Sequence, residues 1–81
     1  MAQKRFHKPV IVQLGRIDRD RVIETVAEAA EILLRDWPAP ESHHRLKAME
    51  ICLAVINGYK PPSKARDAFI IAAKDAQVLL S

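Results

Sequence analysis

The segment from Thr25 to Trp37 constrains the fold more than any other part of the sequence. Thr25 followed by Glu28 forms a capping box, a pair of side chains typical of the first turn of a helix. The apolar residues that follow recur at the i, i+3, i+4 and i+7 spacing of one helical face: Val26, Ala29, Ala30, Leu33, Leu34 and Trp37. Pro38 disfavours helical geometry at Trp37, so the helix should end there. Ile32 falls among charged residues, and we expect it on the outward side. The segment therefore predicts a packed domain with a helical core.

The size and composition of the chain limit the class of protein further. A chain of 81 residues has room for one domain, and its apolar content of 49% argues against disorder. The single cysteine, Cys52, excludes an intramolecular disulfide and fits a reducing compartment. The apolar runs at residues 10–12 and 51–56 are too short for a signal-peptide core or a membrane span. We therefore expect a cytoplasmic protein that makes no contact with a membrane.

Two short strands are expected before this helix. Val10, Val12 and Leu14 alternate with other residues and predict a strand from Pro9 to Leu14. Residues 20–24 predict a second strand, and the two should pair as an antiparallel hairpin because too few residues separate them for a parallel crossover. Residues 1–8 are polar and basic without periodicity, so we expect a mobile N-terminal tail there and a single small domain over residues 9–81.

Two further helices should follow. Ser42 is placed to cap a second helix that runs to Asn57 and is ended by Gly58. Apolar residues cover more than half of its circumference: Ala48, Met49, Ile51, Cys52, Leu53, Val55 and Ile56. So wide an apolar arc predicts a helix that is contacted on more than one side.

The third helix should begin at Ser63, which is placed to cap it. Its apolar stripe consists mainly of alanine, which permits a close approach to a neighbouring helix: Ala65, Ala68, Phe69, Ala72, Ala73, Ala76 and Leu79. The expected fold class is therefore α+β, with an N-terminal two-stranded antiparallel β-hairpin packed on three α-helices, the second helix being central.

The chain is poorly equipped for catalysis or cofactor chemistry. Cys52 lies on an apolar arc, where a thiol behaves as a small hydrophobic group. His43 and His44 point about 100° apart on a helix and do not converge on one ion. With 2 glycines in the chain there is no phosphate-binding loop. We expect no catalytic residue, no metal and no cofactor, and therefore a protein that is not an enzyme.

Basic residues gather near the N-terminus, namely Lys4, Arg5, Lys8, Arg16, Arg19 and Arg21. Because two-stranded ribbons fit the major groove, one hypothesis is a nucleic-acid-binding module that uses the Arg16–Arg21 hairpin. Asp18 and Asp20 interrupt this run, and no aromatic residue is interleaved for base stacking.

The favoured hypothesis is a small non-catalytic protein that acts through protein–protein contacts. The apolar residues Val10, Ile11 and Val12 lie on an edge strand, which is a template for strand addition by another chain. The partner would be an unidentified protein or a second copy of this chain. A symmetric homodimer would form through the edge strand or through helix faces.

Motifs along the chain resemble one known family. They are Pro9-Val10, Glu28-Ala29-Ala30 with Leu33-Leu34, Trp37-Pro38, Ala48 with Cys52-Leu53 and Gly58, and Ala65-Arg66 with Ala68-Phe69-Ile70 and Ala72-Ala73. In this order they resemble small bacterial proteins grouped as domain of unknown function 982, over residues 6–80. The resemblance implies a stand-alone small domain with no assigned activity, so it brings no functional residues. Arg66 is the motif position that caps and core do not explain. We expect it to bond to carbonyls at the end of the second helix or to an acidic residue on another helix.

Overall fold

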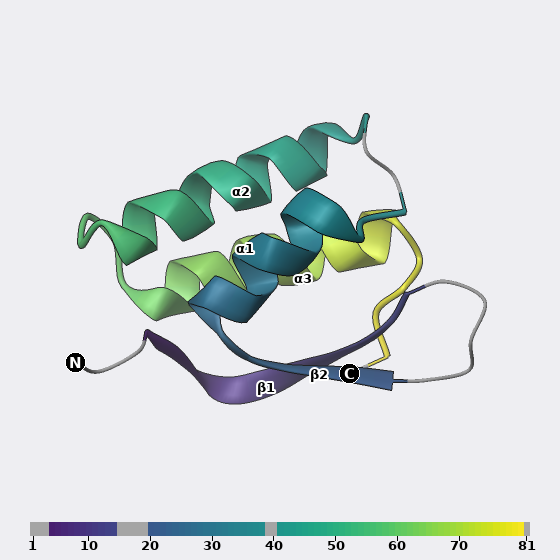
Figure 1. The fold of residues 1–81 in the computed structure, drawn as a ribbon, viewed down its shortest axis with the longest axis horizontal. Coiled ribbons are helices and arrows are strands. Elements are labelled where there is room, and N and C mark those ends of the chain that lie inside the picture. The colour runs from purple at the N-terminus through teal and green to yellow at the C-terminus, as the bar shows by residue number, and fades with distance from the viewer. Residues whose placement is uncertain (1–3, 15–19, 39–40, 81) are drawn as a thin grey trace.

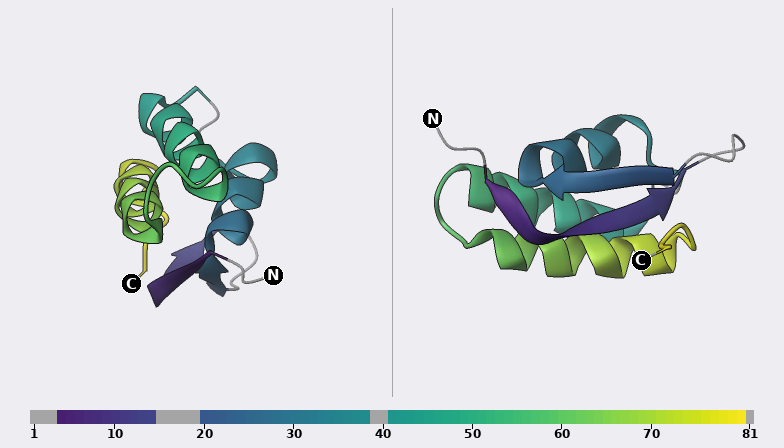
Figure 2. Two further views of the ribbon diagram at one scale, coloured as in Figure 1. Left: turned by 90° about the vertical axis from the view of Figure 1, so that its left-hand side faces the viewer. Right: turned by 90° about the horizontal axis from the view of Figure 1, so that it is seen from below.

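The computed structural model describes residues 4–14, 20–38 and 41–80. Two strands are followed by three helices: β1 (Arg5–Gln13), β2 (Asp20–Thr25), α1 (Val26–Arg35), α2 (His43–Ile56) and α3 (Pro62–Asp75). This order and the antiparallel pairing of β1 with β2 confirm the predicted α+β class. Figures 1 and 2 show three layers: the sheet, then α1 and α3 side by side over one of its faces, then α2 on top of both helices.

Strand β1 is longer than predicted and begins at Arg5 rather than at Pro9. Phe6 is buried in the core, and the backbone N–H of Val26 donates to the carbonyl of Lys4 over 2.9 Å, so both contacts fix this end of the sheet. The expectation of a loose tail is therefore wrong for residues 5–8. The pairing with β2 is irregular between Arg5 and Val10, and residues 7–9 are all exposed, so the alternation that begins at Val10 does not extend to the first part of the strand.

The C-terminal segment 78–80 forms an additional contact with the sheet. Gln77 has a φ of 60°, which ends α3 and turns the chain back toward β1. Gln13 then donates its N–H to the carbonyl of Val78 over 2.9 Å, and Leu80 donates to the carbonyl of Ile11 over 2.8 Å. Leu79 therefore lies beyond α3, opposite Val12, and not on the α3 stripe where the sequence placed it.

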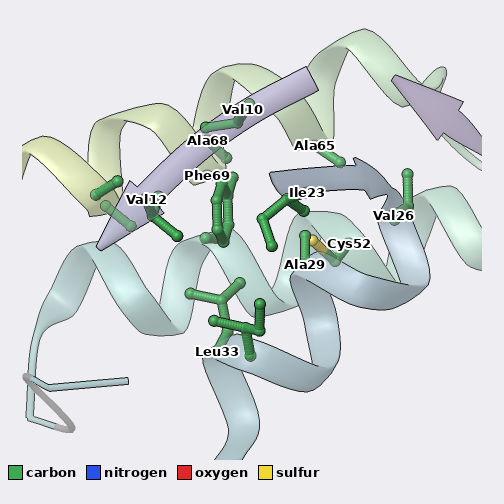
Figure 3. Packing of buried hydrophobic residues seen from close by; sticks show 14 of the residues in the cluster. Val10, Val12, Ile23, Val26, Ala29, Leu33, Cys52, Ala65, Ala68 and Phe69 are labelled. Atoms are coloured by element: carbon green, nitrogen blue, oxygen red, sulfur yellow. The ribbon is translucent and has the colours of Figure 1, made fainter. Parts of the chain in front are cut away.

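The core lies between the inner face of the sheet and the helices. Figure 3 shows the Phe69 ring pointing from α3 into a space bounded by Val10 and Val12 of β1 and by Leu33 of α1. The ring packs on Trp37 at a centroid distance of 5.5 Å, with 58° between the ring planes. The predicted alanine stripe of α3 is confirmed, since Ala65, Ala68, Ala72 and Ala73 are all buried.

Helix α1 begins at the predicted capping box but buries a different arc. The Oγ1 of Thr25 accepts the N–H of Glu28, and the Glu28 carboxylate accepts the N–H of Thr25. Ile32 is only 2% exposed, whereas Leu34 is 58% exposed. The prediction that Ile32 faces outward and Leu34 faces the core is therefore wrong. The physical reason is that α1 packs against β2 as well as α2, which extends its buried arc to include Ile32.

Helix α2 has the two helical neighbours that its wide apolar arc predicted, but it forms the outer layer. It packs against α1 and α3, and the residues that it buries there are the small ones Ala48, Cys52 and Val55. The middle layer consists of α1, which contacts α2, α3 and β2, and of α3, which contacts α1, α2 and β1. The N-cap of α2 is Ser42, as predicted.

The start of α3 differs from the prediction. Its N-cap is Pro61, which forms no side-chain capping bond, and the first helical residue is Pro62. Proline suits this position because its φ is fixed near the helical value and its missing N–H would have no partner in the first turn. Ser63 lies inside the helix, so its predicted role as the cap is wrong.

Candidate functional site

The basic residues proposed for nucleic-acid binding do not form one cluster within the described residues. Lys4, Arg5, Lys8 and Arg21 are exposed, whereas Arg16 and Arg19 lie outside the described residues. Arg5 pairs with Thr25 and Arg21 pairs with Val12, which places the two arginines at opposite ends of β2. Four residues of strand separate these positions by about 13 Å. Arg5 also lies 3.9 Å from the Glu24 carboxylate, which reduces the local positive charge.

The predicted interface residues Val10, Ile11 and Val12 lie in β1, where little of them faces solvent. Val10 and Val12 are fully buried against the helices, and Ile11 is half-buried. The edge of β1 beside them is bonded to the C-terminal segment 78–80. An incoming strand would have to displace this segment, so the geometry does not favour an interface at these residues. A homodimer through helix faces stays a prediction.

A cluster of Ser42, His44 and Asp75 joins the start of α2 to the end of α3. The Ser42 hydroxyl donates to Oδ2 of Asp75 over 2.8 Å, and Nδ1 of His44 lies 3.5 Å from Oδ1. The bond from Ser42, and secondly that from His44, hold the pKa of the Asp75 carboxyl below its usual value. The Ser42 oxygen also accepts the N–H of Arg45 as the helix cap. Because Ser42 bonds to the carboxylate and not to the imidazole, the cluster is a structural tether and not a nucleophile–base pair.

Cys52 lies on the buried side of α2, in the core. Burial raises the pKa of its thiol to about 11, so the nucleophilic thiolate is scarce at neutral pH. Across residues 4–14, 20–38 and 41–80, no three His, Cys, Asp or Glu side chains lie together as a metal site requires. None of the helices in this described part is long and apolar enough to cross a membrane.

The most unusual surface is the outer face of α2. Leu46, Leu53 and Ile56 are 56%, 52% and 44% exposed, although the helix buries smaller residues on its inner side. Leu46 and Leu53 are two turns apart on the same side of the helix. We call these three residues the outer α2 face. The Arg45 guanidinium donates to the carbonyl of Leu33 over 2.7 Å and fixes the start of α2 against the end of α1.

The sequence did not identify the outer α2 face as a site. The apolar arc of α2 was the available signal, because it is wider than two helical neighbours can cover. The sequence gives no information on which part of that arc stays exposed, since the position of α2 depends on the packing of α1 and α3. The width of the arc alone therefore predicts a central position for α2, whereas the structure places α2 in the outer layer.

Arg66 has a structural partner, but not one of those expected. Its Nε donates to the carbonyl of Lys8 in β1 over 2.7 Å. The bond links α3 to the sheet, whereas the sequence suggested a partner on another helix. Lys8 precedes Pro9, which has no N–H to offer a neighbouring strand. Arg66 therefore covers part of the β1 edge that the C-terminal segment leaves open.

Comparisons with known proteins agree with this architecture. The family model described as "Protein of unknown function (DUF982)" matches residues 8–80. The chain is also similar to the NMR structure of the Agrobacterium tumefaciens protein Atu1219, a structural-genomics target. The TM-score is 0.78 at 28% identity, over 95% of this chain and 76% of that chain. No curated protein matches the chain significantly. The family match extends from β1 to the C-terminal segment, and the chain belongs to the DUF982 family of proteins of unknown function.

Proposed function

We propose that this protein is a non-catalytic cytoplasmic binding module that acts through protein–protein contacts made by the outer α2 face. The observation that carries the proposal is the exposure of Leu46, Leu53 and Ile56 on a helix whose buried residues are small. Single exposed leucines are common, but three large apolar side chains exposed on one helix provide more apolar surface for a partner than a single one does.

Burial of this face would contribute part of the free energy of binding to a partner. Complete burial of a leucine or isoleucine side chain contributes about 1.5–3 kcal/mol relative to full exposure. Each of the three residues keeps roughly half of its surface in water, so covering all three would contribute roughly 2–4 kcal/mol. A helix or a shallow apolar groove on the partner would fit a surface of this shape.

Two potential nucleophiles among the described residues, Cys52 and Ser42, are held in structural roles, which supports a role without catalysis. The pKa of the Cys52 thiol is raised by burial, and Ser42 is bonded as a helix cap. The unpaired cysteine and the lack of a second one fit a reducing cytoplasm.

Photo-crosslinking inside the native cells tests the proposal. A photoreactive residue replaces Leu53, and a matched variant carries it at Glu31, which is exposed on α1. The proposal predicts a discrete crosslinked protein at Leu53 only, insensitive to nuclease treatment. A band at twice the mass of the chain would identify the partner as a second copy. Equal crosslinking from Leu53 and Glu31, or none from either, would refute the proposal.

A further inference from the structure

A groove of about 420 Å³ lies between α2 and α3 and does not include the outer α2 face. The two helices pack against each other (Figure 2). Ile51 of α2 with Ala68 and Ile71 of α3 provide the apolar part of its surface. Ile71 is 53% exposed, so this surface is in contact with water in the free protein. The volume falls within the range of about 300–1,000 Å³ that is typical of small-molecule sites.

Basic side chains surround this apolar surface. Lys47 of α2, Lys60 of the connecting segment and Lys64 of α3 line the groove, against the single acidic residue Asp67. Lys47 lies 3.9 Å from Glu50, so part of its charge is compensated. Within the described part of the chain, Lys60 and Lys64 form no ion pair. The groove therefore combines an apolar surface with uncompensated positive charge.

We propose that this groove binds a small organic anion with an apolar body, such as an aromatic or branched aliphatic carboxylate. The apolar body would cover Ile51, Ala68 and Ile71, and the carboxylate would pair with Lys60 and Lys64. An inorganic anion would leave the apolar surface in water, and a neutral molecule would leave the lysines unpaired. Only an anion with an apolar body complements both parts of the groove. This binding is independent of the protein contact proposed for the outer α2 face.

Titration of the full chain with two matched probes, followed by amide NMR spectra, tests the inference. The probes are 1-naphthoate and the neutral 1-naphthalenemethanol. We expect 1-naphthoate to give saturable shifts at Ile51, Ala68 and Ile71, with a Kd of about 1 mM or lower. We expect the alcohol to bind about tenfold more weakly, because it forms no charge-assisted bond. Equal affinities, shifts elsewhere on the surface, or no saturable shift in the millimolar range would overturn the inference.

Charge-neutral variants provide the second arm of the test. The double variant Lys60→Gln and Lys64→Gln should bind 1-naphthoate about tenfold more weakly, and its affinity for the alcohol should be unchanged. Lys74→Gln is the matched control, because Lys74 lies on α3 but does not line the groove. Leu53→Lys should leave 1-naphthoate binding unchanged, which separates this inference from the protein-binding proposal. Unchanged 1-naphthoate affinity in the double variant would overturn the proposed pairing of the carboxylate with Lys60 and Lys64, because glutamine keeps part of the methylene chain and removes only the charge.

Discussion

Replacement of Thr25 by valine tests the junction between the sheet and the helices. Thr25 is the last residue of β2 and the N-cap of α1. Its Oγ1 accepts the N–H of Glu28 over 3.1 Å, and it donates to the Glu28 carboxylate over 3.2 Å. Valine keeps the branched shape and the strand preference of threonine but removes the hydroxyl. The substitution therefore isolates the cap from the packing of the side chain.

The expected loss of stability in Thr25→Val follows from the geometry of the cap. Removing an N-cap hydroxyl lowers the free energy of unfolding by about 0.5–2 kcal/mol. Thr25 is only 5% exposed, so water replaces its hydroxyl poorly and the loss should be in the upper part of that range, about 1–2 kcal/mol. For a domain of this size each kcal/mol lowers Tm by about 4–8 °C, which predicts a decrease of roughly 5–15 °C.

Urea unfolding followed by far-ultraviolet circular dichroism measures this loss, with Thr25→Ser as the control. Serine keeps the cap and removes one buried methyl group, which should lower the free energy of unfolding by about 0.8 kcal/mol. The valine variant should therefore be the less stable of the two. The capping argument is refuted if Thr25→Val is as stable as Thr25→Ser, or lies within about 0.5 kcal/mol of the unmodified chain.

Three further predictions concern the core and the tethers between elements. Because burial raises the pKa of the Cys52 thiol from 9.0 to about 11, iodoacetamide at pH 8 should alkylate the folded chain at least about 100-fold more slowly than the unfolded chain; similar rates would contradict this. Arg66→Ala should lower the free energy of unfolding by about 1 kcal/mol through loss of the bond to Lys8, and an unchanged urea midpoint would show that the bond contributes nothing. Ser42→Ala should raise the pKa of the Asp75 carboxyl toward its ordinary value, as measured by carboxyl NMR titration. Since the folded pKa is the lower one, the contact with Asp75 stabilises the fold above the ordinary carboxyl pKa and is lost as the pH falls through the folded pKa. The stability difference between Ser42→Ala and the unmodified chain should therefore shrink at low pH, and identical titration of Asp75 in both chains would refute this.

Local signals predicted the elements of this fold, and tertiary packing decided their arrangement. The capping box at Thr25 and the alanine stripe of α3 could be read from the sequence because their residue choices act over one or two helical turns. The sides of Ile32 and Leu34 could not, because they depend on where β2 and α2 contact α1. The same applies to the C-terminal segment, since Leu79 continues the α3 spacing in sequence but pairs with Val12 after the turn at Gln77.

The candidate site was less predictable than the fold. The apolar stretch at Val10 and Val12 predicts an edge available to a partner, yet both side chains are buried and the edge beside them is bonded to the C-terminal segment 78–80. The wide apolar arc of α2 did indicate that this helix carries more apolar surface than two helical neighbours cover. Which of its apolar residues remain exposed depends on the tilt of α2 across α1 and α3, and sequence periodicity does not determine that tilt.

The most direct test of the proposed function compares binding and stability in one variant, Leu46→Lys with Leu53→Lys. Both residues are more than half exposed, so the free energy of unfolding should change by less than about 0.5 kcal/mol for each substitution. The affinity for the protein crosslinked at Leu53, measured with purified components, should fall about tenfold or more, because at least about 1.4 kcal/mol of apolar contact is lost. Unchanged affinity, or unfolding of the variant chain, would contradict the proposal that the outer α2 face serves binding and not the stability of the fold.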